Sequence, residues 1–417
     1  MWMLTMTDSQ RFPLHLLLRI FIPFALGYFL SFLYRVVNNV IAGDLTRDLS
    51  IDAGQLGLLT SAYLISFAAF QLPLGILLDR YGSRRVEAFL LVFAAIGAIV
   101  FALAQSLSGL VLGRALIGFG VSACLMAALR AFVQWFPAEK LPAANGLHLA
   151  AGGLGILAAT RPVEFALQFM DWRGVFMILA GLTLCVAALI FFIVPEKPNS
   201  TAQGSFKEQV AGIKQIFTSA TFWQSAPWSF TTQGASGAIM GLWAGPWLRD
   251  VALLDRPASV AILSWMAAGV IAGYFMTGFI AERLVRLGIP LARVSAIGMI
   301  CFMLVQVGII LELTQVATLL WILFGFFSTM GALTYAQLSQ AFPKVLAGRV
   351  NTALNMLVFV FAFTTQWCMG EIIKSYSAAG SPTYAPQGYQ TAFAIVLGIQ
   401  VLGMLFYLYK PKTKKPI

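Results

Sequence analysis

Charged side chains inside apolar stretches are the feature of this sequence most directly tied to chemistry. Four arginines stand within long apolar runs of the chain: Arg35, Arg114, Arg130 and Arg161. A charged side chain at the centre of a bilayer costs about 2.5–3.5 kcal/mol on insertion scales, so such residues usually face a cavity or a partner. A guanidinium presents a rigid fork of donors that fits a carboxylate or a phosphate. The sequence therefore indicates recognition of an anion.

Polar and aromatic residues accompany the first of these arginines. Tyr34 precedes Arg35, and Asn38 follows three residues later, so we expect all three to contact a solute. A structural ion pair between Arg35 and Asp44 is the alternative. The second half of the chain offers neutral candidates for the same cavity: Gln233, Trp243, Tyr335 and Asn355. Trp and Tyr are also common at membrane interfaces, where they would serve as anchors instead.

One carboxyl group is a candidate for binding a proton. Glu164 lies well inside an apolar run, whereas Glu87, Glu312 and Glu371 fall near the ends of such runs. Arg161 precedes Glu164 by three residues, which places both on neighbouring parts of one helical face. A buried carboxyl group can bind and release a proton. We predict proton coupling at Glu164 and solute contact at Arg161; a permanent bridge between the two is the alternative.

The residue types that metal sites and enzymes need are sparse. The chain has two histidines and four cysteines, and none of them shows metal-ligand spacing. It has neither a Gly-rich phosphate loop nor a nucleophile–base pattern within its apolar runs. We therefore expect no cofactor, no metal and no enzymatic activity.

The composition identifies the medium in which these residues work. Of 417 residues, 59% are hydrophobic and 10% are charged, against about 25% charged residues in soluble domains. Mean hydropathy is +0.84. These values exclude a soluble globular protein and predict a lipid bilayer as partner. The net charge of +11 suits basic loops that orient membrane helices, so we expect no nucleic-acid partner.

Apolar runs long enough to cross a bilayer predict an all-α integral membrane protein with twelve transmembrane helices. The expected spans lie near 14–42, 55–78, 86–106, 109–134, 143–170, 174–194, 222–248, 258–281, 291–312, 316–341, 350–373 and 389–409. With both termini on one side, that side holds 18 Lys and Arg residues and the other side 5. This bias predicts a multi-pass protein of the cytoplasmic (inner) membrane with both termini in the cytoplasm.

The two halves of the chain resemble each other. The sequence Gly75-Ile-Leu-Leu-Asp79-Arg80 has a counterpart 203 residues later, and Phe136-Pro137 has one 206 residues later. Two similar offsets in matching loops indicate duplicated six-helix units. We predict an N-terminal bundle over 1–194, a cytoplasmic central loop over 195–220 and a C-terminal bundle over 221–417.

Two motifs carry a resemblance to a known family. The loop Gly75-Ile-Leu-Leu-Asp79-Arg80-Tyr81-Gly82-Ser83-Arg84-Arg85 closely resembles the signature of the major facilitator superfamily between spans two and three, and Arg114-Ala-Leu-Ile-Gly118 resembles its second motif. The resemblance implies a major facilitator fold and a gating role for the following residues: Gly75, Asp79, Arg80, Gly82, Arg84, Arg85, Arg114 and Arg130. We expect Asp79 to contact the N-terminus of span eleven, and Gly75 to allow close helix approach. The arginines could instead serve only as topology anchors, and Arg114 and Arg130 could be structural.

The first span is similar to that of the organophosphate antiporters and of the anion–cation symporters. In those branches an arginine that matches Arg35 meets the anionic group of the substrate. The segment from Arg161 to Glu164 departs from the Gly-Pro motif of drug exporters in the family, which favours uptake. Span seven has no arginine before Arg249, which argues against a dedicated phosphate exchanger.

We therefore predict a secondary active transporter, a monomer, that moves a small, anionic organic solute by alternating access. Proton symport is one form of coupling that the buried carboxyl would permit. Export of an amphipathic compound or a siderophore is the alternative within the same class. A transporter-like sensor that signals without net flux is the alternative outside it.

Overall fold

The computed structural model describes residues 14–137, 140–195, 214–343, 346–377 and 383–408, and within those ranges the regular secondary structure is helical, with no strand. Ten described segments are long and apolar enough to cross a membrane. Two further helical segments lie where spans five and seven are expected, at 141–166 and 220–250. The described helices thus accommodate the twelve expected spans, and the all-α prediction is confirmed.

The first half of the chain contains the following helices: α1 (Leu14–Leu16), η3 (Leu17–Phe21), α2 (Ile22–Val36), α3 (Asn38–Leu49), α4 (Ala53–Leu103), α5 (Leu107–Gly120), α6 (Cys124–Trp135), α7 (Leu141–Ala158), α8 (Arg161–Ala166) and α9 (Trp172–Ile193). Element α4 contains expected spans two and three. It breaks at Gly82, whose φ of 80° lies in the region that favours glycine.

The second half contains the remaining helices: α11 (Ala220–Ala238), η5 (Ile239–Trp243), α12 (Ala244–Asp250), α13 (Arg256–Arg286), α14 (Leu291–Ile310), η6 (Thr314–Val316), α15 (Ala317–Ser328), η7 (Thr329–Ala332), α16 (Leu333–Ala341), α17 (Ala347–Ser375) and α18 (Pro386–Leu408). Most of the expected central loop, residues 196–213, lies outside the described residues.

Local sequence signals explain several helix boundaries. Asp52 caps α4 by accepting the Gln55 backbone N–H, while the Gln55 side chain accepts the Asp52 N–H in return. Asp171 caps α9 through the Gly174 N–H. Pro162 stands in the first turn of α8. Because proline lacks an N–H, span five does not continue as one helix, and it divides at Thr160 instead.

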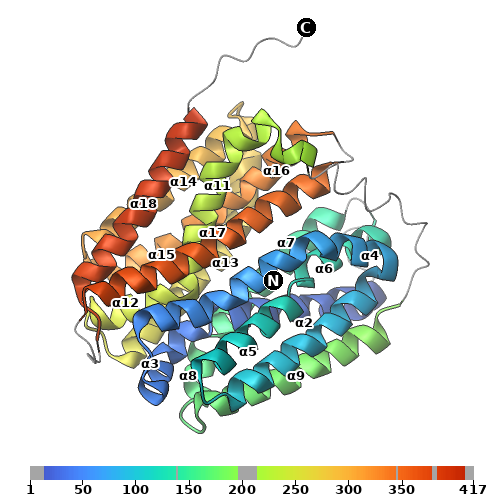
Figure 1. The fold of residues 1–417 in the computed structure, drawn as a ribbon. Coiled ribbons are helices and arrows are strands. Elements are labelled where there is room, and N and C mark those ends of the chain that lie inside the picture. The colour runs from blue at the N-terminus through green and yellow to red at the C-terminus, as the bar shows by residue number, and fades with distance from the viewer. Residues whose placement is uncertain (1–13, 138–139, 196–213, 344–345, 378–382, 409–417) are drawn as a thin grey trace.

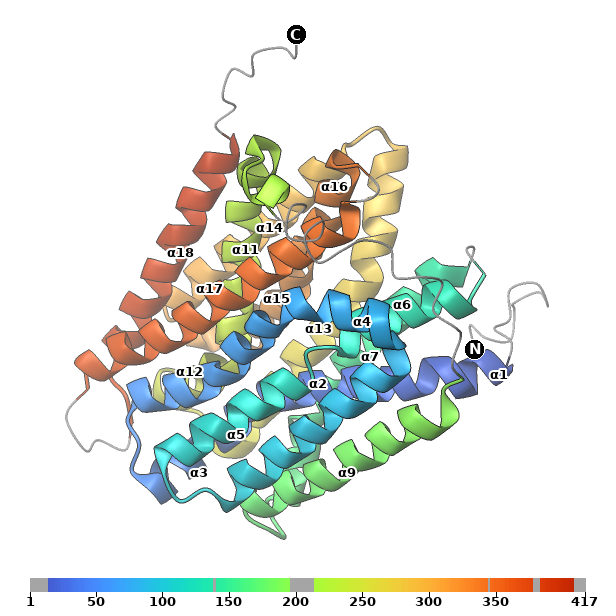
Figure 2. The ribbon, with the colours of Figure 1, turned by 45° about the vertical axis from the view of Figure 1, so that its right-hand side comes forward.

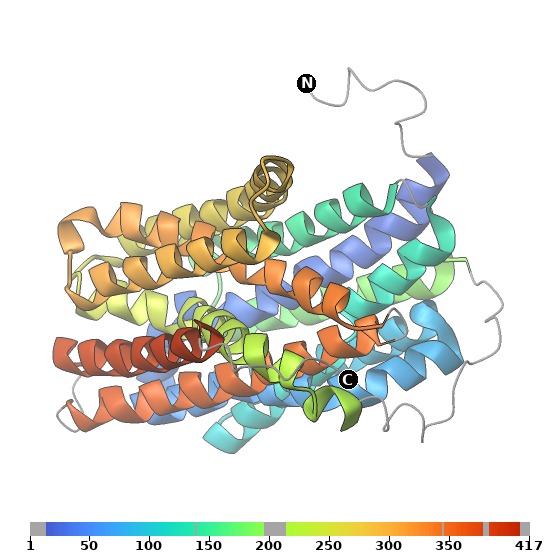
Figure 3. The same ribbon diagram turned by 90° about the horizontal axis from the view of Figure 1, so that it is seen from above.

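The helices form two bundles that follow the order of the chain (Figure 1). Viewed from above, most yellow-to-red helices of the second half lie on one side and most blue-to-green helices of the first half on the other (Figure 3). The bundles approach each other where α3 and α12 lie, and they diverge toward α6 and α16 (Figure 2). We call the first region the closed end and the opposite region the terminal end. The two-bundle arrangement agrees with the duplicated halves, whose boundaries remain a prediction.

Close helix packing holds the first bundle together. A Cβ atom on Gly118 of α5 would overlap the backbone carbonyl of Tyr63 on α4, so only glycine fits at this contact. Arg114 of α5 is fully buried, and its Nη1 donates to the backbone carbonyl of Tyr34 at 2.7 Å. Arg114 therefore fixes α5 against α2, which agrees with the structural alternative for this residue.

Candidate functional site

Arg35 stands at the end of α2, between the two bundles, among aromatic rings. Its guanidinium carbon lies 4.3 Å from the ring centroid of Phe32, 5.6 Å from Phe67 and 4.9 Å from Phe359. Phe67 belongs to α4 in the first half, and Phe359 belongs to α17 in the second half. The Tyr63 ring lies 5.9 Å away. Aromatic faces attract a cation without neutralising its charge, so these rings hold the guanidinium and leave it positive.

No carboxylate pairs with Arg35 among the described residues, and its Nε is buried without a hydrogen-bond partner. The alternative pairing with Asp44 does not form, because Asp44 pairs with Arg47 and Arg256. An unpaired guanidinium in an apolar setting is costly. The arrangement can therefore accept an anionic group.

Hydroxyl and amide groups from both bundles surround this arginine. The positive charge of Arg35 interacts electrostatically with three tyrosines: Tyr28 of α2, Tyr274 of α13 and Tyr335 of α16. The Tyr335 hydroxyl donates to Asn355 Oδ1 at 3.0 Å, and Asn355 Nδ2 in turn lies 3.5 Å from Gln71 Oε1 across the interface. These groups can bind the hydroxyl and carboxylate oxygens of a polar solute.

Gln233 lies on α11 in the second bundle. It is half-buried, and its Nε2 donates to the Ser229 hydroxyl at 2.9 Å. Two of the four residues predicted from the second half, Tyr335 and Asn355, are thus brought toward Arg35, while Gln233 binds within its own bundle.

Three other residues predicted to contact the solute are packed elsewhere. Tyr34 is fully buried, and its hydroxyl lies 3.0 Å from that of Thr183 inside the first bundle. Asn38 donates to Thr60 at 2.8 Å. Trp243 is also fully buried and donates to the backbone carbonyl of Gln366 at 3.0 Å. Each of these residues is enclosed by neighbouring helices in the described state, and its contact with a solute stays a prediction.

The predicted proton site in span five also differs. Glu164 follows the helix break at Thr160, and its carboxylate accepts from Arg256 Nε at 2.7 Å. Arg256 Nη2 lies 2.9 Å from Asp44 Oδ2, so one arginine of the second half bridges two carboxylates of the first. Arg161 is exposed, and the Arg161–Glu164 bridge does not form. Glu164 therefore belongs to a contact between the bundles at the closed end.

Further polar contacts join the two bundles at this end. The Asn39 side chain donates to the backbone carbonyl of Met240 and accepts the Gly245 N–H at 2.9 Å. Ser264 donates to Thr160 at 2.9 Å. Asn39 and Thr160 lie in the first bundle, and their partners lie in the second. These bonds hold the closed end shut.

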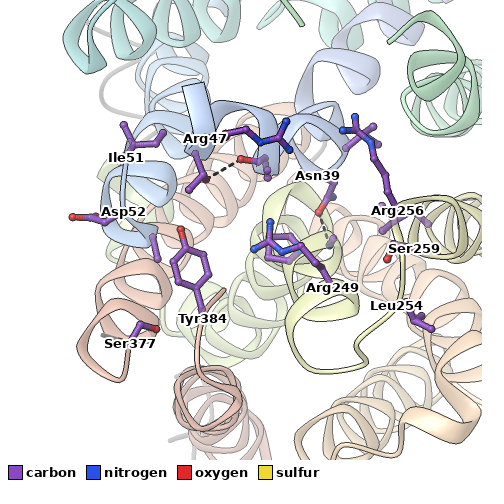
Figure 4. A pocket seen from close by; sticks show the side chains of 18 of the residues that line it. Asn39, Arg47, Ile51, Asp52, Arg249, Leu254, Arg256, Ser259, Ser377 and Tyr384 are labelled. Atoms are coloured by element: carbon purple, nitrogen blue, oxygen red, sulfur yellow. Dashed lines mark hydrogen bonds between the residues drawn. The ribbon is translucent and has the colours of Figure 1, made fainter. Parts of the chain in front are cut away.

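A basic cavity of about 880 Å³ lies among these contacts. Its lining includes Arg47, Arg249, Arg256 and Lys374, and Figure 4 shows the first three side chains together with Asn39. Lys374 pairs with Asp52 at 2.9 Å. Burial acts to raise the pKa of the Asp52 carboxyl, but the Gln55 N–H and Lys374 outweigh it and hold that pKa below its usual range.

The signature loop between spans two and three is described in part. Gly82 adopts the positive φ that a tight turn requires. A Cβ on Gly75 would meet no described atom within 4 Å, so the close approach predicted there is absent among the described residues. Arg84 donates to the Val194 carbonyl at 3.3 Å, and Arg80 lies 5.4 Å from the Tyr81 ring.

Two further arginines of the predicted gate differ in their exposure. Arg85 is exposed, and Arg130 is half-buried on α6. The side chain of Asp79 lies outside the described residues, so its contact with span eleven stays a prediction.

Comparison with known proteins agrees with this architecture. Residues 24–365 match the family profile described as Major Facilitator Superfamily. The chain belongs to the major facilitator superfamily. A solved structure of this fold, a bacterial homolog of the human lysosomal transporter Spinster, superposes with a TM-score of 0.75 and 17% identity, covering 93% of this chain and 95% of that chain.

Curated relatives are named as transporters. The nitrate/nitrite transporter NrtP of Picosynechococcus sp. (strain PCC 7002) is 34% identical over 129 residues, which span 31% of this chain and 24% of that protein. The probable galactarate/D-glucarate transporter GudP of Bacillus subtilis is 24% identical over 396 residues, which span 86% of each chain. The chain thus spans about a quarter of one relative and most of the other.

Several residues of this major facilitator protein were missed from the sequence. Gln71 reaches Asn355 across the interface, and Phe359 covers the Arg35 guanidinium. Polar Gln71 within an apolar run was the available signal. An isolated Phe in such a run gives none. Glu87, expected near a helix end, is fully buried.

Proposed function

We propose that this protein is a secondary transporter that moves a small organic anion across the membrane by alternating access, with Arg35 as the group that binds the anion. The observation that carries the proposal is the guanidinium of Arg35, which lies among four aromatic rings with no carboxylate partner in the described residues. A bound anion would supply the missing counter-charge.

The neighbouring groups favour a carboxylate that also bears hydroxyls. The charge of Arg35 interacts with three tyrosine side chains, those of Tyr28, Tyr274 and Tyr335. The Tyr335 hydroxyl also donates to Asn355. Phenol and amide groups hydrogen-bond to hydroxyls and carboxylates alike. GudP, whose name refers to galactarate and D-glucarate, matches most of this chain. A sugar acid is therefore the substrate class that we propose to test first.

The closed end supports an alternating-access mechanism. The Arg256 bridge and the Asn39 bonds join the bundles at one end, and the bundles diverge toward the other (Figure 2). The bias of Lys and Arg would place the termini in the cytoplasm. On that orientation the closed end faces outward, and the described state opens inward. Both the cytoplasmic-membrane location and the orientation belong to the proposal.

Uptake into proteoliposomes tests the proposal. Purified protein is reconstituted, and entry of radiolabelled D-glucarate, D-galacturonate and nitrate is measured with and without a pH gradient. We expect uptake of at least one carboxylate and its loss in Arg35→Gln. Arg19→Gln is the matched control, because that arginine is exposed on the same first span and should be dispensable. Equal uptake in the Arg35→Gln variant and the unmodified protein would rule out the proposed site.

A further inference from the structure

Glu87 is a carboxyl group enclosed within the first bundle. It lies on the second part of α4, beyond the break at Gly82, and is fully buried. A Cβ on Gly27 of α2 would overlap Glu87 Oε1, so the side chain fills the space that this glycine leaves. Among the described residues neither carboxyl oxygen has a hydrogen-bond partner, and the thiol of Cys124 on α6 is the neighbouring polar group.

A histidine extends this polar region. His148 of α7 is fully buried, and neither ring nitrogen has a hydrogen-bond partner in the part of the chain that the structure describes. Its ring stacks on that of Tyr28 of α2, with the ring centroids 4.4 Å apart, and the backbone of Cys124 lies close to it. Glu87, Cys124, His148 and Tyr28 come from four different helical elements, and we call them the buried cluster.

The buried cluster extends toward the anion site. The charge of Arg35 acts on both Cys124 and Tyr28. Among the other charged groups on the surrounding helices, Arg114 of α5 is directed at the Tyr34 carbonyl, and α9 carries no charged residue beyond Arg173. Arg130, on α6, lies six residues beyond Cys124. Arg35 thus links the buried cluster to the place where the anion would bind.

Physical chemistry assigns the protonation state of this carboxyl. An ionised carboxylate with no counter-charge is strongly disfavoured in an apolar interior, so the group instead takes up a proton. No ion pair involves Glu87 among the described residues, unlike Glu164, which is held by Arg256. A carboxyl that is neutral in one conformation and reaches water in another can carry a proton between the two sides of the membrane.

We propose that Glu87 binds the proton that moves with the anion, and that the buried cluster couples this proton to the charge of Arg35. The inference rests on the proposed function of anion transport. Through Cys124 and Tyr28, an uncompensated Arg35 would favour the ionised form of Glu87. An anion bound to Arg35 would remove that influence and favour the protonated form. Linkage requires the reverse as well, so protonation tightens anion binding. The proton comes from water on one side, forms the O–H of Glu87 and returns to water on the other.

Two measurements test the inference. Infrared spectroscopy of the protein in lipid, without any anion, follows the C=O stretch of protonated carboxyl groups as pH is varied. We expect a band that titrates with pH and that is lost in Glu87→Gln. The control Glu312→Gln, in the loop after α14, should retain this band. Uptake and anion exchange are then compared in the same proteoliposomes. In Glu87→Gln the anion accumulation driven by a pH gradient should fall at least about tenfold, while anion exchange persists.

The outcomes separate this inference from the proposed function. If the unmodified protein moves none of the anions tested, the proposed function fails, and the infrared band still decides whether Glu87 titrates. If anions are moved but Glu87→Gln accumulates them with a pH gradient as the unmodified protein does, the inference alone is overturned. Transport that ignores the pH gradient in the unmodified protein also overturns it. Glu87→Asp keeps a carboxyl and should restore gradient-driven uptake, which guards against loss through misfolding.

Discussion

The bridge between Asp44, Arg256 and Glu164 should set the balance between the two states of the transporter. Arg256 lies 2.7 Å from Glu164 and 2.9 Å from Asp44. These carboxylates are 21% and 17% exposed, and the arginine is 38% exposed. A hydrogen bond to a charged group is worth about 1.5–3 kcal/mol when buried, and an exposed ion pair about 0–1 kcal/mol. Because these groups are partly exposed, each of the two contacts of Arg256 should stabilise the closed end by about 1 kcal/mol.

Arg256→Gln removes both contacts and should therefore destabilise the closed end by about 2 kcal/mol. Since about 1.4 kcal/mol is a factor of ten, the population open at this end should rise by a factor of roughly 30. A state that is rare in the unmodified protein should become readily detectable.

Distances between spin labels measure this shift. Gln105 is exposed in the loop before α5, and Gln315 is exposed in η6, both at the closed end. Labels at these two positions report on opposite bundles in a variant whose native cysteines are replaced. Arg256→Gln should add a population with longer distances. Arg47→Gln is the control, because its side chain is 76% exposed and lies 3.8 Å from Asp44. Identical distance distributions in Arg256→Gln and the unmodified protein would refute the gating role.

Three further predictions concern single groups. Tyr335→Phe removes the hydroxyl that donates to Asn355 and should raise the Kd for the anion by roughly three- to tenfold, since such a bond is worth about 0.5–1.5 kcal/mol; binding titrations check this. Gly118→Leu should lower the thermal unfolding temperature, because a side chain there overlaps the Tyr63 carbonyl, whereas Gly146→Leu, with open space around it, should not. The pKa of Asp52 is held below its usual range, so its contact with Lys374 stabilises the closed end at pH values above the ordinary pKa of an Asp. This stabilisation is lost as pH falls through the lowered pKa. Spin-label distances should therefore lengthen in acid, and Asp52→Asn should abolish this acid-dependent lengthening.

The sequence predicted the architecture well because its signals are local and repeated. Long apolar runs require helices in a bilayer, and the break at Gly82 follows from a glycine in the loop motif. The special environment of Arg35 was also predictable, since an arginine in an apolar run needs one, and aromatic rings surround its guanidinium.

The direction of individual side chains was harder to predict. Tyr34 is the chain neighbour of Arg35 but points into the first bundle, because successive helical residues face directions about 100° apart. Glu164 finds its partner 92 residues away in Arg256, a pairing that only the packing of the two halves creates. Glu87 appeared to lie at a helix end, yet the bundle encloses it, and its burial depends on Gly27 of another helix.

Equilibrium binding of a radiolabelled sugar acid to the purified protein tests the central claim most directly. D-Glucarate binding is compared between the unmodified protein, Arg35→Gln and the Arg19→Gln control, whose arginine is exposed on the same first span. Truncating one partner of a buried charge pair costs about 2–5 kcal/mol, so Arg35→Gln should raise the Kd by roughly 30-fold or more while the control leaves it unchanged. Binding in Arg35→Gln as tight as in the unmodified protein would contradict the account.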